Sequence, residues 1–111
     1  MATIEDFQRL DIRVARVLEA APLEGARRPA YRLLLDCGPE VGRKRSSAQI
    51  TDLYEPDGLV GRLVLAVVNF PPRRIAGFES EVLTLGVYAE WGVALVAPDE
   101  RGGVRPGDRL G

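Results

Sequence analysis

The segment Val67–Gly86, with the sequence VVNFPPRRIAGFESEVLTLG, decides the fold. It continues the unbroken apolar run Leu63–Val68, and Leu63–Phe70 is predicted to be the central strand, buried on both faces. Prolines cannot donate hydrogen bonds to a neighbouring strand, so the pair Pro71–Pro72 must end the pairing. Arg73–Arg74 then stand in a rigid loop before apolar residues resume. A strand, a basic loop and a second strand form a surface suited to holding another molecule.

Three further strands are predicted upstream of this segment. Asp11–Glu19 loses its two-residue period near Ala15–Arg16, which indicates a bulge or a strong bend of the kind that small barrels require. Alternate residues of Tyr31–Cys37 are apolar, so Cys37 is expected to be an inert thiol in the core. Arg43–Ile50 has a basic start and predicts a third strand. These three strands precede the central apolar strand in the chain.

Short helices are expected at two places. Thr3–Leu10 has a threonine that can cap a helix and acidic residues in the first turn. Pro56 suits the first position of a second helix, which would lie between the third and fourth strands, as in the OB-fold. Val82–Tyr88 and Val93–Ala97 are predicted as the last strands.

We therefore expect an all-β fold: a single domain over residues 1–111 built on a five-stranded OB-fold barrel with short helices. The barrel core would span about residues 11–98. Residues 1–10 and 99–111 would be extra flanking elements.

Composition excludes several kinds of chemistry. The chain has no histidine, a single cysteine and a formal net charge of −1. It contains no metal-binding or phosphate-loop motif, so we expect no enzyme activity, no metal and no cofactor. Acid pairs such as Glu79 with Glu81 are common on solvated strands. The single thiol and the N-terminus, which lacks the apolar core of a signal peptide, favour a cytoplasmic protein.

Basic residues occur in clusters. All but Lys44 of the 15 basic residues are arginines, and the clusters lie at Arg27–Arg28, Arg43–Arg45 and Arg73–Arg74. Genomic base composition or a thermophilic host explains a preference for arginine over lysine without any function. The clustering needs a separate explanation.

Four motifs in order carry a resemblance to a known family: Asp11–Val14, Arg45–Ile50, Asn69–Arg74 and Gly77–Leu83. The chain resembles the stand-alone tRNA-binding domain proteins, and most closely the CsaA-like export chaperones, from Ile4 to Leu110. The resemblance implies an OB-fold whose flanks pair in a homodimer. It implies structure-dependent tRNA binding and binding of unfolded preprotein segments. In tRNA-binding modules a Gly-Met pair typically stands two residues after the serine that corresponds to Ser80. This chain lacks the pair, and the CsaA-like proteins lack it too.

An RNA-binding surface is the first hypothesis. Arginine and lysine would neutralise phosphates, and neutral side chains would donate or accept hydrogen bonds. The predicted RNA-binding residues are Arg43, Lys44, Arg45, Ser46, Asn69, Arg73, Arg74 and Ser80. Tyr31, Phe70 and Phe78 are candidates to stack a base if they are exposed.

A peptide-binding groove is the second hypothesis. Its predicted residues are Phe70, Pro71, Pro72, Ile75 and Phe78, although core packing is the alternative role for each aromatic or aliphatic one. Two grooves in a homodimer would add avidity for an extended chain. The resemblance thus implies a homodimeric secretion chaperone that binds preproteins, with the export machinery as a further partner. The alternative is a structure-specific tRNA-binding protein with no chaperone role.

Overall fold

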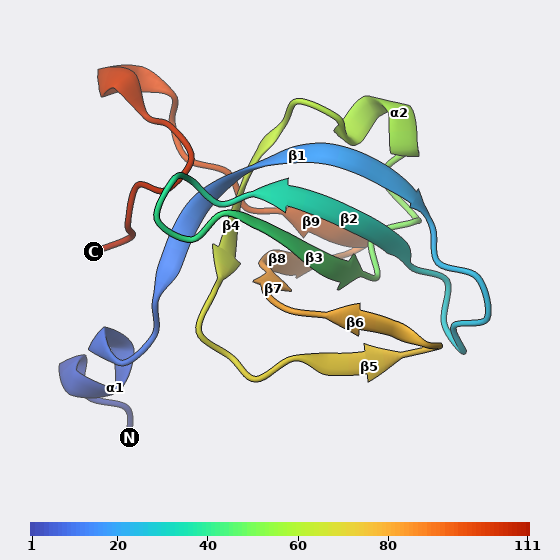
Figure 1. Cartoon of the computed structure of the whole chain (residues 1–111), viewed down its shortest axis with the longest axis horizontal. Coiled ribbons are helices and arrows are strands. Elements are labelled where there is room, and N and C mark those ends of the chain that lie inside the picture. The colour runs from blue at the N-terminus through green and yellow to red at the C-terminus, as the bar shows by residue number, and fades with distance from the viewer.

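The computed structural model describes all 111 residues and is mostly β, with 11% helix. Five antiparallel strands form one sheet in the order β3-β2-β1-β4-β7, which curls into a nearly closed barrel (Figure 1). The strands are β1 (Ile12–Pro22), β2 (Tyr31–Asp36), β3 (Arg43–Ala48), β4 (Leu63–Val67) and β7 (Leu83–Thr84). The predicted five-stranded OB-fold barrel is confirmed.

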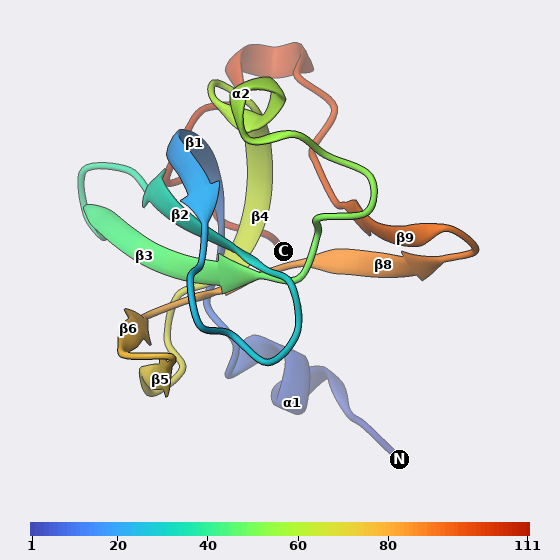
Figure 2. The same cartoon turned by 90° about the vertical axis from the view of Figure 1, so that its right-hand side faces the viewer.

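Two small hairpins and short helices project from this barrel (Figures 1 and 2). The first hairpin pairs β5 (Arg73–Ile75) with β6 (Phe78–Ser80), and the second pairs β8 (Gly86–Ala89) with β9 (Gly92–Leu95). The helices are α1 (Ile4–Gln8), α2 (Pro56–Leu59) and the 3₁₀ turn η1 (Arg101–Gly103). Thr3 caps α1 in a capping box, and Pro56 begins α2, as predicted. No helix is long and apolar enough to cross a membrane.

The predicted strand Val82–Tyr88 is interrupted. β7 pairs with β4 inside the barrel, whereas β8 leaves the barrel to pair with β9. Leu85 lies between them, and its N–H donates to the carbonyl of Leu65. Gly86 follows, where an added Cβ would lie 2.6 Å from a methyl of Val93. β8 can therefore pair this closely with β9 only because residue 86 has no side chain.

β1 is bent by a bulge, as predicted, but between Val17 and Glu19. Ile12 to Arg16 pair with β4, and Arg16 to Pro22 pair with β2 on both sides of the bulge. Ile12 and Val14 pack in a smaller apolar cluster, whereas Ala15 and Val17 pack in the main core. The change of phase near Ala15 thus reflects a strand that moves from one cluster to the other, and the bulge follows two residues later.

The main core lies inside the barrel and contains Cys37. Its largest fully buried side chains include Leu33, Leu35 and Leu59. Burial raises the pKa of the Cys37 thiol to about 11. Since only a thiolate is a good nucleophile, Cys37 is inert at neutral pH.

The barrel closes along a seam between β3 and the chain around β7. The Ser46 hydroxyl is fully buried, lies 2.8 Å from Thr84 Oγ1 and 3.1 Å from the carbonyl oxygen of Val82. The Glu81 N–H donates to the carbonyl of Arg45 at 2.8 Å. The Ser46 hydroxyl therefore belongs to this seam, and not to the RNA-facing surface to which the sequence analysis assigned it.

The C-terminal segment runs alongside β1. The Gly107 N–H donates to the carbonyl of Val14 at 2.8 Å, and the Val14 N–H donates to the carbonyl of Asp108 at 2.9 Å. Gly38 makes room for this segment, because a Cβ at Gly38 would lie 2.8 Å from the backbone nitrogen of Gly107. The chain end is thus tied to the first strand.

Candidate functional site

Four arginines converge from two loops at one end of the barrel. Arg27 and Arg28 come from the loop between β1 and β2, and Arg73 and Arg74 come from β5. They line a cavity of about 500 Å³, which we call the arginine basin. Gln49 and Ser47 also line the basin and supply neutral polar groups.

The two loops meet because of their turn geometry. The β5–β6 turn places Ala76 and Gly77 at φ values of 50° and 79°, as a tight two-residue hairpin requires. Gly25 in the opposite loop has a φ of 81°, and a Cβ there would lie 3.7 Å from that of Ala76. Figure 1 shows the β1–β2 loop beside the tip of this hairpin. The close approach of Gly25 to Ala76 thus brings the two arginine pairs to one basin.

Charge in the basin is of one sign. No Asp or Glu lines it, and none of its four arginines takes part in an ion pair. The Arg74 guanidinium donates only to the carbonyl of Gly77, at 3.1 Å. Guanidinium groups bind phosphate through paired N–H donors. The basin is therefore chemically suited to the phosphates of a polyanion.

An apolar groove adjoins the basin. It consists of a cavity of about 370 Å³ and a smaller one of about 160 Å³. Ser47, Arg73 and Ile75 line both cavities and also the basin. The other apolar residues of the groove include Phe70, Pro71, Leu83, Leu85, Tyr88, Val93 and Leu95. One face of the molecule thus offers a basic concavity and an apolar one side by side.

The structure brings only some of the predicted basic residues to this face. Arg73 and Arg74 lie in the basin, whereas Arg43, Lys44 and Arg45 do not line it. The Arg45 guanidinium is already paired, 3.2 Å from Glu81 and 3.4 Å from Glu79. The Lys44 ammonium lies 4.0 Å from Glu81. Arg43 is exposed and has no ion pair.

Glu81 is fixed by the same contacts. Partial burial acts to raise the pKa of its carboxyl group, but hydrogen bonds from the backbone N–H and the guanidinium of Arg45 outweigh burial, so the pKa is lowered. Glu81 stays ionised and holds Arg45 against β6. Arg45 thus positions the hairpin that carries Arg73 and Arg74.

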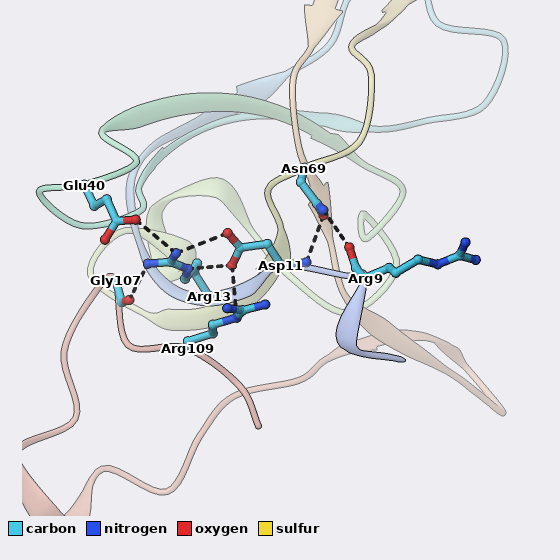
Figure 3. A network of polar contacts seen from close by, with 7 residues as sticks. All are labelled: Arg9, Asp11, Arg13, Glu40, Asn69, Gly107 and Arg109. Carbon is cyan, nitrogen blue, oxygen red and sulfur yellow. Dashed lines mark hydrogen bonds and ion pairs between the residues drawn. The ribbon is translucent and has the colours of Figure 1, made fainter. Parts of the chain in front are cut away.

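The predicted neutral ligands are occupied within the protein. Asn69 accepts a hydrogen bond from the Asp11 N–H at 2.9 Å and donates to the carbonyl of Arg9 at 2.8 Å, so it joins the end of α1 to the barrel (Figure 3). The Ser80 hydroxyl accepts from the Ser47 N–H at 3.0 Å. Asn69 does not line the basin or the groove. Both side chains hold the site's elements in place.

The predicted apolar set is divided. Phe70, Pro71 and Ile75 line the groove, and Phe70 is 42% exposed. Pro72 is exposed and lines none of these cavities, and Phe78 lines a separate cavity together with Arg45. Tyr31 is buried and its hydroxyl donates to the carbonyl of Tyr54, so it is not available to stack on a base.

Sequence reasoning missed two contributors to the site. Arg27 and Arg28 were noted as a cluster but were not assigned to binding. Their position between Gly25 and Pro29, in a loop with no apolar period, was the available signal. The apolar residues of β7 to β9 were read only as strand residues.

Comparison with known proteins identifies the family. Residues 12–108 match the family model for a putative tRNA binding domain. The chain superimposes on the crystal structure of a CsaA chaperone protein from Picrophilus torridus with a TM-score of 0.94 and 46% identity, covering 100% of both chains. A CsaA chaperone from Bacillus anthracis has 47% identity and a TM-score of 0.89, with 100% of this chain and 99% of that one covered.

A methionine–tRNA ligase from Thermotoga maritima is 34% identical over 108 residues, which are 97% of this chain. These residues are only 16% of the ligase's length. The resemblance seen in the sequence motifs is thus confirmed, and the chain belongs to the tRNA-binding domain family, among its CsaA-like members.

Proposed function

We propose that this protein is a non-catalytic binding module that binds tRNA through the arginine basin. The observation that carries the proposal is the convergence of four arginines without carboxylate partners on one concave surface. In OB-folds, the loop after the first strand and the loop after the fourth strand flank the nucleic-acid site. Arg27 and Arg28 lie in the β1–β2 loop. Arg73 and Arg74 lie in the β5–β6 hairpin, which belongs to the connection between the fourth and fifth barrel strands, β4 and β7. The matching family model supports tRNA as the ligand.

A salt titration with matched variants tests this proposal. Each phosphate that a cation neutralises in an RNA complex contributes about 0.7–0.9 to the slope of log affinity against log salt. We expect the double variant Arg27→Gln/Arg73→Gln to lose about 1.5 in slope and to bind tRNA more weakly. The control is Arg9→Gln/Arg101→Gln, which removes the same charge from side chains that are 81% and 91% exposed in surface ion pairs outside the basin.

Equal tRNA affinity for the two double variants would contradict the proposal. So would an affinity that does not change with salt. A comparison of tRNA with an unstructured RNA of the same length would then measure how far binding depends on RNA structure.

Preprotein binding is the second function that we propose, and the apolar groove favours it. Leu83 in this groove is 45% exposed, and Arg73 lies at the junction with the basin. An extended unfolded segment with apolar side chains would fit along such a surface. In this proposal the protein acts as a chaperone in the cytoplasm, and the export machinery receives the bound chain. The CsaA structures support it by their description as chaperones.

A competition experiment separates the two ligands. We expect Leu83→Ser to weaken binding of a labelled signal-sequence peptide about fivefold, with little effect on tRNA, because the change removes apolar area from the groove. Val60→Ser, at a side chain that is 53% exposed elsewhere, is the control. If both variants bind the peptide like the wild type, the groove is not the peptide site. Displacement of the peptide by tRNA would indicate that the two ligands share Arg73.

A homodimer formed through the flanks is also proposed. α1 has no buried residue, and its Ile4 and Phe7 side chains are 62% and 37% exposed. Together with Leu10 and Leu110 they line a cavity of about 520 Å³ between the two chain ends. Ile4→Glu is expected to give monomers by sedimentation, whereas Glu5→Gln on the same helix should leave the dimer intact. A dimeric Ile4→Glu variant would contradict this interface.

A further inference from the structure

A second concavity lies beside the arginine basin, on the outer face of β1, β2 and β3. It has a volume of about 290 Å³, at the lower end of the range for small-molecule sites. We propose that this base pocket binds one nucleobase, preferentially guanine, of an RNA whose phosphates lie in the arginine basin. The inference rests on the proposed RNA binding and adds base recognition to it.

The strand register builds the pocket from two rows of outward side chains. Glu19, Leu34 and Arg45 lie opposite one another across β1, β2 and β3. Ala21 and Arg32 form the next row. The small Ala21 and the half-buried Leu34 leave an apolar floor between charged side chains. The floor can cover the face of a flat heterocycle.

Phe78 forms the aromatic wall of the pocket. Its ring is half-buried, and the Arg45 guanidinium lies 5.9 Å from the ring centroid. Because Glu79 and Glu81 hold Arg45, the ring and the guanidinium have fixed positions before any ligand binds. Base stacking on an aromatic side chain in OB-folds contributes substantially to affinity. Phe78, predicted as a stacking or peptide-binding residue, therefore has a defined place to stack a base.

Two free charged groups define the edge that the base must present. Neither Glu19 nor Arg32 takes part in an ion pair, and both are exposed. A carboxylate is an acceptor only, and it can accept two parallel N–H bonds. Guanine offers two adjacent donors, N1–H and N2–H, and its O6 and N7 accept from a guanidinium. Adenine, cytosine and uracil do not combine two neighbouring ring-edge donors with acceptors in this way.

The base pocket and the basin are one strand apart. Arg32 lies opposite Ser47 in the register of β2 and β3, and Ser47 lines the basin. Neighbouring strands are about 4.8 Å apart. In this proposal one nucleotide places its phosphate in the basin and its base against Phe78 of the neighbouring pocket.

Fluorescence anisotropy on two oligomers tests the inference. The probes are an oligouridine and the same oligomer with one central guanosine, measured at the same salt concentration. We expect the wild type to bind the guanosine oligomer about tenfold more tightly, the effect of one good bidentate pair. Glu19→Gln should abolish most of this preference and leave oligouridine binding in place. Glu90→Gln, an exposed carboxylate on the far hairpin, should keep it.

A second measurement locates the base. Guanosine monophosphate, but not inorganic phosphate, should shift the methyl NMR signals of Leu34 and Ala21. Salt-dependent oligouridine binding without a guanosine preference would overturn the base pocket and leave the proposed RNA binding standing. Failure of both oligomers to bind would overturn the base pocket alone if the protein still binds tRNA, and would overturn both proposals if tRNA binding also fails. If an apolar peptide shifts the Leu34 methyls and the nucleotide does not, the pocket is a peptide site and the inference is wrong.

Discussion

The Ser46 hydroxyl oxygen lies 2.8 Å from the Thr84 hydroxyl oxygen, across the seam between the first and last strands of the sheet order. β3 and β7 would otherwise be sheet edges with unpaired backbone groups. Edges of this kind are templates for aggregation, and closing the barrel removes them. A serine at this buried position therefore has a structural role that depends on its hydroxyl group.

Loss of this hydroxyl should weaken the barrel. We expect Ser46→Ala to lower the free energy of unfolding by about 1–2 kcal/mol, because Thr84 and the Val82 carbonyl lose a partner. Urea unfolding measures the change. Ser47→Ala is the control, since the Ser47 hydroxyl donates no hydrogen bond in the fold, and it should change the free energy by less than about 0.5 kcal/mol. Similar values for both variants would mean that the seam does not depend on the hydroxyl.

Gly38 should tolerate no side chain. Gly38→Ala would bring a methyl group against the backbone of Gly107 and force the C-terminal segment away from β1. The expected loss is more than about 3 kcal/mol. Gly42→Ala is matched to it, because Gly38 and Gly42 have φ values of 92° and 85° but nothing lies within 4 Å of a Cβ at Gly42. Its cost should be only the backbone strain, about 1–2 kcal/mol. Equal costs would show that the close approach is unimportant.

Ala76 is a residue with a Cβ in a left-handed conformation. Its φ of 50° is strained for alanine, and only glycines share a positive φ elsewhere in the chain. Ala76→Gly should therefore raise the free energy of unfolding by up to about 1 kcal/mol, since relief of strain exceeds the added entropy of the unfolded chain. Ala89→Gly, at a position with a negative φ, should lower it by about 0.5–1 kcal/mol. If both substitutions lower the free energy of unfolding, Ala76 is not strained in the folded protein.

Acid should remove a stabilising ion pair between Asp11 and Arg13. The hydrogen bond from the Arg13 guanidinium, 2.6 Å away, lowers the pKa of Asp11 below its usual value of 3.8 despite partial burial (Figure 3). Because the pKa of Asp11 is lower in the folded state than in the unfolded state, the ion pair contributes to the free energy of unfolding above about pH 4. This contribution is lost as the pH falls through the pKa of the folded state.

Asp11→Asn should accordingly be less stable than the wild type at neutral pH, and the difference should shrink below about pH 4. Glu24→Gln removes an exposed carboxylate without an ion pair, and it should show no such convergence. Thermal unfolding followed at a series of pH values provides the comparison. A gap that stays constant down to pH 2 would indicate that the pair does not titrate as described.

The parts of the fold that follow from local pattern were predictable from sequence. The alternation over Tyr31–Cys37 gave the buried face of β2, and the apolar run gave the buried β4. The end of β4 was not predictable: the expected strand ran to Phe70, whereas β4 ends at Val67 and the Val68 N–H donates to the carbonyl of Asp11 outside the sheet. Local hydrophobicity does not encode where a strand loses its neighbour.

The site was predictable only in part, for a different reason. Arg27 and Arg73 are far apart in sequence, and they line one basin because the β1–β2 loop lies beside the β5–β6 turn. The pairing of Arg45 with Glu79 and Glu81 likewise depends on β6 lying against β3. Arginines in similar clusters thus have different roles, which long-range packing decides. Alternate residues of a strand point to the same face, so Ser46 could have been predicted to lie in the core with Ala48. It had instead been assigned to the RNA-binding set.

The attachment of the C-terminal segment to β1 has a consequence for folding. Arg13 donates to the carbonyl of Gly107, a residue 94 positions later. This hydrogen bond of β1 cannot form before the C-terminal segment has been synthesised. Contacts between such distant residues slow folding, and nascent domains grow at about 5–20 residues per second. We therefore expect that the contacts of β1 cannot be completed until residues 107–110 have left the ribosome.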